Sequence, residues 1–279
     1  MRDLPSRHQV RRLLDRLGLS PRKALGQHFL VSRRVQQRII NAADLNTEDV
    51  VVEVGPGLGV LTRELARRAR RVTAVELDVE LARALDRDFA GEATVRVIQG
   101  DGRTIGYDEL LEGETRYKLV ANLPYYAANP IVRRFLESVP KPECMVITVQ
   151  KEVARNMAAP PGRMGLLGVS VQFYARPRIV CYVPPQAFYP PPQVSSAVVR
   201  LDVREHPAVE VDDVNAFFYL VRAGFSAPRK QLRNALAQGL DITAGQAEGL
   251  LSGAGLDHRR RAETLTLEEW GGLYRVFSG

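Results

Sequence analysis

The sequence predicts an α/β fold with a parallel-rich central sheet, followed by a small all-helical C-terminal domain. Strand and helix patterns alternate between residues 50 and 98, which is typical of a doubly wound parallel sheet. The first of these strands, residues 50–54, is rich in valine, as expected for a parallel strand that is buried on both faces. From Asp212 onward only helical patterns follow, and this change of period predicts a domain boundary near residues 204–211.

Hydrophobic periodicity assigns the elements and the domain limits. We expect strands at residues 50–54, 71–75, 94–98, 118–121, 144–149 and 197–203. We expect helices at residues 32–43, 58–69, 78–89 and 129–137, from residue 151, and at 212–225, 229–238, 243–253 and 266–277. Residues 168–183 fit either further strands or a helix that passes into a strand. The first domain is placed at residues 1–206, including a basic N-terminal extension, and the second at residues 207–279.

The composition is that of an ordinary globular protein. Of the 279 residues, 45% are hydrophobic and 25% are charged. The four histidines and two cysteines have no metal-ligand spacing, so we expect no metal site. No apolar run approaches the ~20 residues that span a bilayer, and no secretory signal is visible. We therefore expect a cytoplasmic protein that does not bind membranes.

The positive charge favours a polyanionic partner. The formal net charge is +7, and lysine occurs at only five positions, so most of the 39 basic residues are arginine. Arginine binds phosphate bidentately and stacks on bases, which suits contact with nucleic acid. A GC-rich coding sequence would explain the ratio of arginine to lysine, but it would not explain the net excess of positive charge.

A glycine-rich segment after the first strand predicts a site for a nucleotide-type ligand. Residues 55–59 are Gly-Pro-Gly-Leu-Gly, which allows a sharp turn and close approach of the backbone to a ligand. Glu76 ends the second strand, as expected for a group that hydrogen-bonds ribose hydroxyls, and Asp101 follows the third strand at the same edge of the sheet. The loop alone fits a simple tight turn equally well, but strand, loop, helix, strand and acid in this order favour ligand binding. The spacing differs from the G-x-G-x-x-G fingerprint of dehydrogenases.

The segment Asn122-Leu123-Pro124-Tyr125 follows the fourth strand and carries the strongest chemical signal. An exocyclic amine that attacks a methyl group must be held in line with it, and the Asn122 side-chain oxygen with a nearby backbone carbonyl could accept its two protons. Pro124 restricts the backbone of Leu123 and removes a competing donor. Tyr125 offers a face on which a base can stack, worth about 1–3 kcal/mol. The alternative is a simple turn after a strand.

Several segments together resemble the KsgA/RsmA family of S-adenosylmethionine-dependent rRNA adenine-N6 methyltransferases. The Asn-Leu-Pro-Tyr segment is the most specific of them, and the similarity extends from residue 25 to about residue 236. The other matching segments are residues 25–30, 53–59, 149–153, 183–192 and 229–236. The resemblance implies a Rossmann-like class I methyltransferase fold for the first domain and a helical C-terminal domain that docks rRNA.

The resemblance also implies roles for individual residues. S-adenosylmethionine would contact Gln27, His28, Leu30, Gly55, Gly57, Glu76, Asp101 and Asn122. Of these, Gly55 would lie against the methionine moiety, Glu76 on the ribose and Asp101 on the adenine amine. The catalytic set would be Asn122, Leu123, Pro124, Tyr125 and Phe188. Within it, Tyr125 and Phe188 would flank the target base, and core packing is the alternative for Phe188. The candidates for RNA contact are Arg22, Lys23, Arg229, Lys230 and Arg233.

The family dimethylates N6 of two adjacent adenosines near the 3′ end of 16S rRNA in the small ribosomal subunit, and the resemblance implies this activity for a monomer. One alternative is an Erm-type methyltransferase of 23S rRNA, which shares fold and chemistry. The segments around Gln27 and Phe188 and the full helical C-terminus favour the first interpretation. The other alternative, an rRNA-binding assembly factor without catalysis, is disfavoured by the intact Asn122 segment. Two positions depart from the family pattern, with His28 in place of asparagine and Gln193 in place of lysine.

Overall fold

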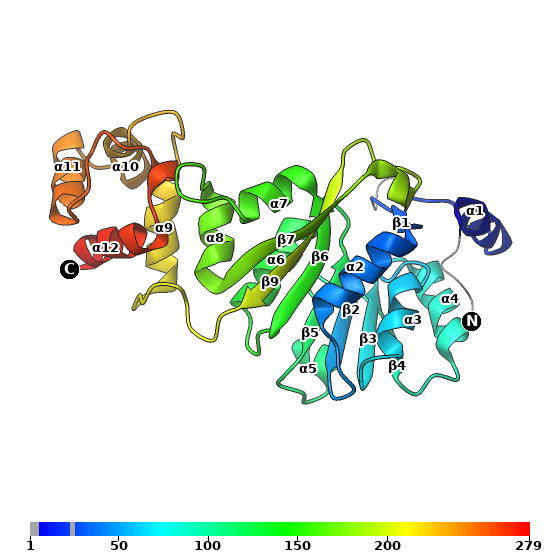
Figure 1. The fold of residues 1–279 in the computed structure, drawn as a ribbon. Helices are drawn as coiled ribbons and strands as arrows, with labels where there is room; N and C mark the ends of the chain where they lie inside the picture. The colour runs from blue at the N-terminus through cyan, green and yellow to red at the C-terminus, as the bar shows by residue number, and fades with distance from the viewer. Residues whose placement is uncertain (1–5, 23–25) are drawn as a thin grey trace. The chain divides into compact units, whose positions relative to one another are not determined.

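The chain forms two compact units, which Figure 1 shows as a ribbon. The structure is a computed structural model that describes residues 6–22 and 26–279, so the predicted RNA contact Lys23 lies outside the described residues. The first unit comprises the described residues up to Ala154 together with Arg178–Val203. The second unit comprises Arg155–Pro177 and Arg204–Gly279. Each unit has its own core and is described separately.

A seven-stranded sheet forms the centre of the first unit (Figure 1). Its strands lie in the order β4-β3-β2-β5-β6-β9-β7. All neighbours from β4 to β6 are parallel, whereas β9 is antiparallel to β6. The strand bounds are β2 Val50–Val54, β3 Arg71–Glu76, β4 Val95–Gln99, β5 Lys118–Asn122, β6 Cys144–Gln150, β7 Ala175–Val183 and β9 Ser196–Val203. The predicted class, a parallel-rich α/β sheet, is confirmed.

The strand order reverses between β2 and β5. The chain runs outward from β2 through β3 to β4, and then returns to place β5 on the other side of β2. In open α/β sheets such a switch point leaves a crevice at the carboxyl ends of the two central strands, where ligands bind. The glycine loop at residues 55–59 follows β2, and Asn122 ends β5, so both lie at this crevice.

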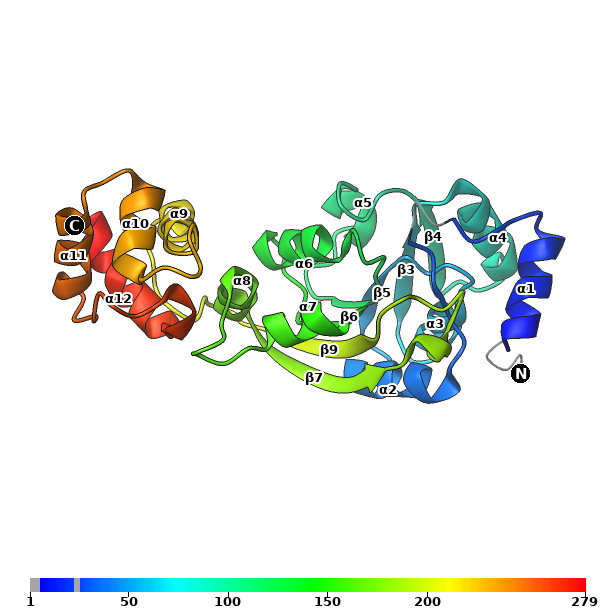
Figure 2. The same ribbon diagram turned by 90° about the horizontal axis from the view of Figure 1, so that it is seen from above.

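Helices cover both faces of the sheet. Figure 2 shows α2 (Arg33–Ala43) and α3 (Val60–Ala66) on one face and α5 (Tyr107–Leu111) and α6 (Ala128–Glu137) on the other. The α2 face is apolar because Val35, Ile39 and Ile40 recur at helical spacing and are buried. The further helices of this part of the chain are α1 Arg7–Arg16, α4 Val79–Phe89 and α7 Lys151–Met157. Ser32 caps α2 by accepting a hydrogen bond from the Val35 amide.

A two-stranded sheet joins segments that are far apart in the sequence. Strand β1 (Phe29–Leu30) pairs antiparallel with β8 (Phe188–Tyr189), and Leu30 lies opposite Phe188. Neither strand was predicted, because two residues are too few to show a periodic pattern. This pairing brings the segments around His28 and Phe188 together at the crevice.

The second unit is a helical bundle. Its helices are α8 Leu166–Tyr174, α9 Val214–Gly224, α10 Leu232–Leu240, α11 Ala244–Gly253 and α12 Leu267–Ser278. Phe173 of α8 stacks on Phe217 of α9 with ring centroids 5.0 Å apart, and Phe218 packs edge-on against it. The sequence analysis placed residues 155–177 in the first domain, whereas this aromatic packing groups them with the second unit. Residues 168–183 form the helix-to-strand passage, one of the two alternatives considered.

Within the described residues, no helix is both long and apolar enough to span a membrane.

Candidate active site

An open cleft of about 1020 Å³ lies at the switch point of the sheet. It is lined by the glycine loop after β2, by the ends of β3 and β5, by the loop after β4, and by residues of β1 and β8. Its lining is mainly apolar with a few polar groups, as is usual for small-molecule sites. Every predicted cofactor-contacting residue lines this cleft: Gln27, His28, Leu30, Gly55, Gly57, Glu76, Asp101 and Asn122.

The glycine loop adopts a backbone that side chains disfavour. Gly55, Gly57 and Gly59 have φ angles of 73°, 58° and 69°. A Cβ atom on Gly57 would lie 3.1 Å from the Phe29 ring, and one on Gly59 would lie 2.8 Å from the Leu85 side chain. Both the positive φ angles and the close neighbours therefore explain why glycine occupies these positions.

Glu76 lies where the loop meets the end of β3. One carboxylate oxygen accepts a hydrogen bond from the Gly57 amide at 3.0 Å, and the other accepts one from the Asp78 amide at 2.9 Å. The side chain is buried, and burial raises the pKa of this carboxyl, while the two amide hydrogen bonds oppose that shift. Glu76 therefore fixes the glycine loop and still presents acceptor oxygens to the cleft.

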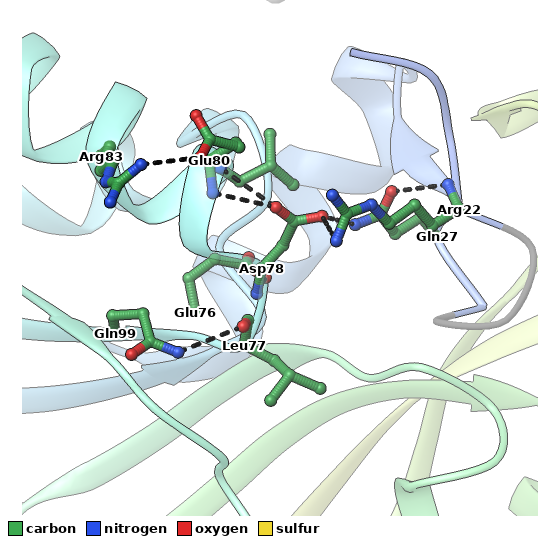
Figure 3. Close-up of polar contacts among 9 residues, drawn as sticks. Arg22, Gln27, Glu76, Leu77, Asp78, Glu80, Arg83 and Gln99 are labelled. Carbon is green, nitrogen blue, oxygen red and sulfur yellow. Dashed lines mark hydrogen bonds and ion pairs between the residues drawn. The ribbon is translucent and has the colours of Figure 1, made fainter.

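Asp78 organises a polar network beside Glu76 (Figure 3). One of its oxygens caps α4 by accepting from the Glu80 and Leu81 amides. The other accepts from Gln27 Nε2 at 3.1 Å and lies 3.4 Å from an Arg22 guanidinium nitrogen. Arg22 was predicted to contact RNA, and in this structure its charge is paired with Asp78. The network connects the N-terminal segment to the edge of the cleft. The sequence analysis did not identify Asp78, because an aspartate at the start of a helix is ordinarily explained by capping alone.

The carboxylate of Asp101, which was predicted to bind the adenine amine, forms an ion pair with Arg103. Arg103 contacts it with Nη2 2.6 Å from one oxygen and Nε 3.0 Å from the other. The hydrogen bond from Arg103 is the largest of the effects that hold the pKa of the Asp101 carboxyl below its usual range. The same guanidinium lies 5.8 Å from the centroid of the Tyr126 ring. Arg103 therefore links the end of β4 to the segment that follows Asn122.

Asn122 is oriented by the N-terminal loop. Its Nδ2 donates a hydrogen bond to the His28 carbonyl at 3.0 Å. Among residues 6–22 and 26–279, no donor contacts the Asn122 side-chain oxygen, and none contacts the Leu123 carbonyl oxygen. Two acceptors with free lone pairs therefore belong to residues that line the cleft.

Tyr125 is held at both ends of its side chain. Its hydroxyl lies 2.6 Å from the Ser196 hydroxyl at the start of β9, and its ring centroid lies 5.6 Å from that of His28. His28 in turn donates from Nδ1 to the Pro190 carbonyl at 2.7 Å. Partial burial raises the pKa of the Tyr125 phenol, so this residue stays neutral near pH 7. Its half-buried ring lines the cleft.

Phe188 is buried in the wall of the cleft. The side chain is only 1% exposed and belongs to the hydrophobic core that includes Leu30, Val183 and Ala187. Its ring therefore does not present an open face in this structure. The alternative considered from the sequence, core packing, describes the observed environment, although Phe188 also lines the cleft.

A buried carboxyl behind the glycine loop was missed by the sequence analysis. Glu53 is 1% exposed on β2 and accepts a hydrogen bond from the Thr62 hydroxyl at 2.6 Å. Burial raises the pKa of Glu53 to about 8. A glutamate inside the otherwise apolar run of residues 50–54 was the signal that could have identified it.

We expect the stability of the protein to fall as pH rises because of Glu53. The folded state holds this proton up to about pH 8, whereas the unfolded state loses it near pH 4.5. Between these values the folded state binds more protons, so the free energy of unfolding decreases with pH, by at most about 1.4 kcal/mol per pH unit. Urea titrations of the wild type and Glu53→Gln between about pH 5 and 8 measure the effect. The variant should show the shallower slope, and equal slopes would disprove the assignment.

The predicted RNA contacts of the second unit differ in their exposure to solvent and in whether a carboxylate already pairs with them. Arg229 and Lys230 are exposed, and neither pairs with a carboxylate within the described residues. Arg233 lies 3.1 Å from Glu248 and is partly buried. Two exposed cations therefore remain free for an anionic partner.

No group of three or more histidine, cysteine, aspartate or glutamate side chains within the described ranges could hold a metal ion.

The fold and the cleft together define a class I methyltransferase, with a mostly parallel sheet, a glycine loop and carboxylates at its switch point. Residues 18–275 match the family model described as ribosomal RNA adenine dimethylase. The chain belongs to this family.

Curated relatives cover nearly the whole chain. A ribosomal RNA small subunit methyltransferase A from Dehalococcoides mccartyi (strain CBDB1) is 50% identical over 272 residues, which cover 97% of this chain and 93% of that protein. The protein of the same name from Moorella thermoacetica is 44% identical and covers 95% of each chain.

Solved structures agree with this assignment. The 23S rRNA methyltransferase ErmE has a TM-score of 0.71 and 29% identity, and the match covers 90% of this chain and all of that one. A dimethyladenosine transferase from Plasmodium falciparum has a TM-score of 0.78 at 23% identity, covers 90% and 98% of the two chains, and supports the fold.

Proposed function

We propose that this protein transfers methyl groups from S-adenosylmethionine to N6 of two adjacent adenosines near the 3′ end of 16S rRNA. The product is N6,N6-dimethyladenosine in the small ribosomal subunit. Family membership and relatives that carry the name small subunit methyltransferase support the substrate. The observation that supports the chemistry best is the pair of unoccupied acceptors, the Asn122 side-chain oxygen and the Leu123 carbonyl, at the end of β5.

The residues of the cleft fit S-adenosylmethionine. Gly55 and Gly57 line the cleft with backbone atoms, so the chain can approach the amino-acid part of the cofactor closely. Glu76 offers carboxylate oxygens to the ribose hydroxyls, and Asp101 offers an acceptor to the adenine amine. His28 completes the set from the N-terminal loop. When bound, the cofactor supplies an electrophilic methyl group on a sulfonium sulfur.

The chain contributes mainly positioning and electrostatics to the reaction. The Asn122 oxygen and the Leu123 carbonyl accept hydrogen bonds from the two N–H groups of the adenine amine and would hold its nitrogen in line with the methyl group of a bound cofactor. The proton that the nitrogen loses on methylation passes to solvent. Tyr125 stacks on the flipped base, and its hydrogen bond to Ser196 keeps the ring in place. After the first transfer one N–H remains, and one acceptor is enough to orient it for the second. Asn122 has no basic character, so it orients the amine without deprotonating it.

We expect the loss of Arg103 to strengthen cofactor binding. The Arg103 guanidinium occupies both oxygens of Asp101, and the adenine amine must share or displace it. Because the pair is partly exposed, Arg103→Ala should tighten the dissociation constant by up to about fivefold. Isothermal titration with S-adenosylmethionine at low and high salt measures this, and the difference between wild type and variant should shrink at high salt. Arg83→Ala, which removes an exposed ion pair with Glu80, is the control. Weaker binding by Arg103→Ala would instead assign Arg103 a supporting role in cofactor binding.

The partner is 16S rRNA within the small subunit or its precursor, and the protein acts on it as a cytoplasmic monomer. The net charge of +7 favours a polyanion, and Arg229 and Lys230 offer exposed positive charge for phosphate contact in the second unit. Replacing both with alanine should weaken binding to small subunits without changing cofactor affinity.

Mass spectrometry of rRNA tests the proposed function. Isolated small and large subunits that lack the modification are incubated separately with the protein and isotope-labelled S-adenosylmethionine. The expected result is two labelled N6,N6-dimethyladenosines in 16S rRNA. Label in 23S rRNA instead would identify the Erm-type activity, and RNA binding without label would identify an assembly factor.

A further inference from the structure

An exposed tyrosine and a lysine form a pair that none of the roles above uses. Tyr182 on β7 is 54% exposed, and the ammonium group of Lys151 lies 5.1 Å from the centroid of its ring. Lys151 begins α7 and belongs to the segment 149–153, which the sequence analysis singled out without assigning it a function. The ring and the ammonium together present an aromatic surface with a positive charge next to it.

This pair lies one strand away from Tyr125. Strand β9 lies between β6 and β7 in the sheet (Figure 2). Gln150 at the end of β6 is the register partner of Ser196 in β9, and the next amide, that of Lys151, donates to the Ser195 carbonyl at 2.9 Å. The hydroxyl of the next residue, Ser196, lies 2.6 Å from the Tyr125 hydroxyl. The two adjacent serines therefore contact Lys151 on one side and Tyr125, the proposed stacking residue, on the other.

Exposed side chains with apolar surface adjoin both Tyr125 and the serine pair in the sequence. Tyr126 is 47% exposed, and Val194, directly before Ser195, is 46% exposed. Tyr126 and Tyr182 each have a cation near the ring, Arg103 for Tyr126 and Lys151 for Tyr182. Single exposed aromatic side chains are common on proteins, but aromatic rings with adjacent cations around one site are typical of surfaces that bind single-stranded nucleic acid.

We propose that Tyr182 and Lys151 bind a nucleotide that flanks the target adenosine. This inference rests on the proposed function, because it requires a single-stranded RNA substrate at Tyr125. The base of the flanking nucleotide stacks on Tyr182, and its phosphate contacts the Lys151 ammonium. Once the target base is extruded, its neighbour also loses a stacking partner, and Tyr182 replaces that partner. The pair therefore contributes to RNA binding without touching the cofactor.

Equilibrium binding to a short RNA tests the inference without requiring catalysis. The probe is a fluorescein-labelled single-stranded oligoribonucleotide that contains two adjacent adenosines, and the protein is the full chain. Tyr182→Ala should weaken binding by about 5- to 150-fold, whereas Tyr182→Phe should bind like the wild type because it keeps the ring. Lys151→Ala should lower the slope of log affinity against log salt by about 0.7, the contribution of one phosphate contact. Tyr219→Ala, which removes an exposed tyrosine of the second unit, is the control.

A second probe separates stacking from a general structural effect. An abasic residue next to the adenosine pair should weaken wild-type binding as much as Tyr182→Ala weakens binding of the intact RNA, and the two losses should not add. Fully additive losses, or unchanged binding by Tyr182→Ala, would overturn the inference. Methylation of 16S rRNA by the wild-type protein is measured in parallel. If the proposed function is wrong, no label enters the rRNA, and the binding comparison between wild type and variants still gives its own result. Unchanged cofactor affinity in all variants is required in either case.

Discussion

Asn122→Ala should reduce kcat for adenine methylation by about 10²- to 10³-fold, comparable to the loss of one oxyanion-hole donor. Within the described part of the chain, the side-chain oxygen of Asn122 accepts no hydrogen bond, and its Nδ2 donates to the His28 carbonyl. Alanine removes the acceptor that orients the adenine amine, so the chemical step is affected more than substrate binding. Single-turnover transfer of labelled methyl to small subunits measures the loss.

The control for this prediction separates catalysis from cofactor binding. Isothermal titration with S-adenosylmethionine should show a change of less than about tenfold, because Glu76 and the glycine loop are untouched. Leu123→Ala is the matched variant, since it changes the neighbouring residue but leaves its carbonyl acceptor in place. Methylation by Asn122→Ala at the wild-type rate would show that the catalytic assignment is wrong.

Phe188→Ala should lower the free energy of unfolding of the first unit by about 3–5 kcal/mol, the usual cost of removing a large buried aromatic side chain. Phe188 is 1% exposed, and its strand β8 holds β1 at the cleft by pairing with Leu30. Hydrogen exchange of the β2 and β5 amides measures the loss in this unit. Trp270, the only tryptophan in the sequence, is buried in the second unit, so its fluorescence follows that unit separately.

A conservative variant distinguishes the two roles considered for Phe188. Phe188→Leu keeps most of the buried volume but removes the aromatic face, so it should restore most of the stability. If its methylation rate also returns, Phe188 acts through core packing. If the leucine variant is stable but its KM for RNA rises by about 5- to 150-fold, the ring also stacks on the target base, as the family resemblance implies.

The sheet and its ligand edge could be predicted because their signals are local. The valine run at residues 50–54 indicates a buried strand, and the glycines at residues 55–59 indicate a backbone that other residues disfavour, which the positive φ angles confirm. Apart from the short helix α5, which was not expected, the helices and strands from β2 to β6 lie within a few residues of their expected positions, because each has a strong period of its own. The positions of Glu76, Asp101 and Asn122 follow from the same pattern, since each lies at or just after the carboxyl end of a parallel strand.

The hydrogen-bond and ion-pair partners of the site's side chains could not be predicted, because the sequence pattern does not state which groups folding brings into contact. Glu53 shares a hydrogen bond with Thr62 inside the core, and its raised pKa results from burial, which the sequence states only indirectly. The ion pair between Arg22 and Asp78 could not be foreseen for a cation that the sequence analysis named as a candidate RNA contact. Likewise the grouping of residues 155–177 with the second compact unit could not be foreseen, because the Phe173 contact with Phe217 spans more than forty positions.

The sequence by itself determined the class of fold, the methyl-transfer chemistry and the family, because short motifs encode the backbone turns and acceptor groups that such chemistry needs. Only the tertiary structure decided what each group is free to do. It leaves the Asn122 oxygen available, occupies Asp101 with Arg103, buries Phe188 and exposes Tyr182 beside Lys151. The physical reason is that hydrogen bonding, burial and ion pairing depend on the folded geometry. Some partners are far apart along the chain, as Asn122 and His28 are, and others, such as Asp101 and Arg103, are close in sequence but pair only because of the local fold.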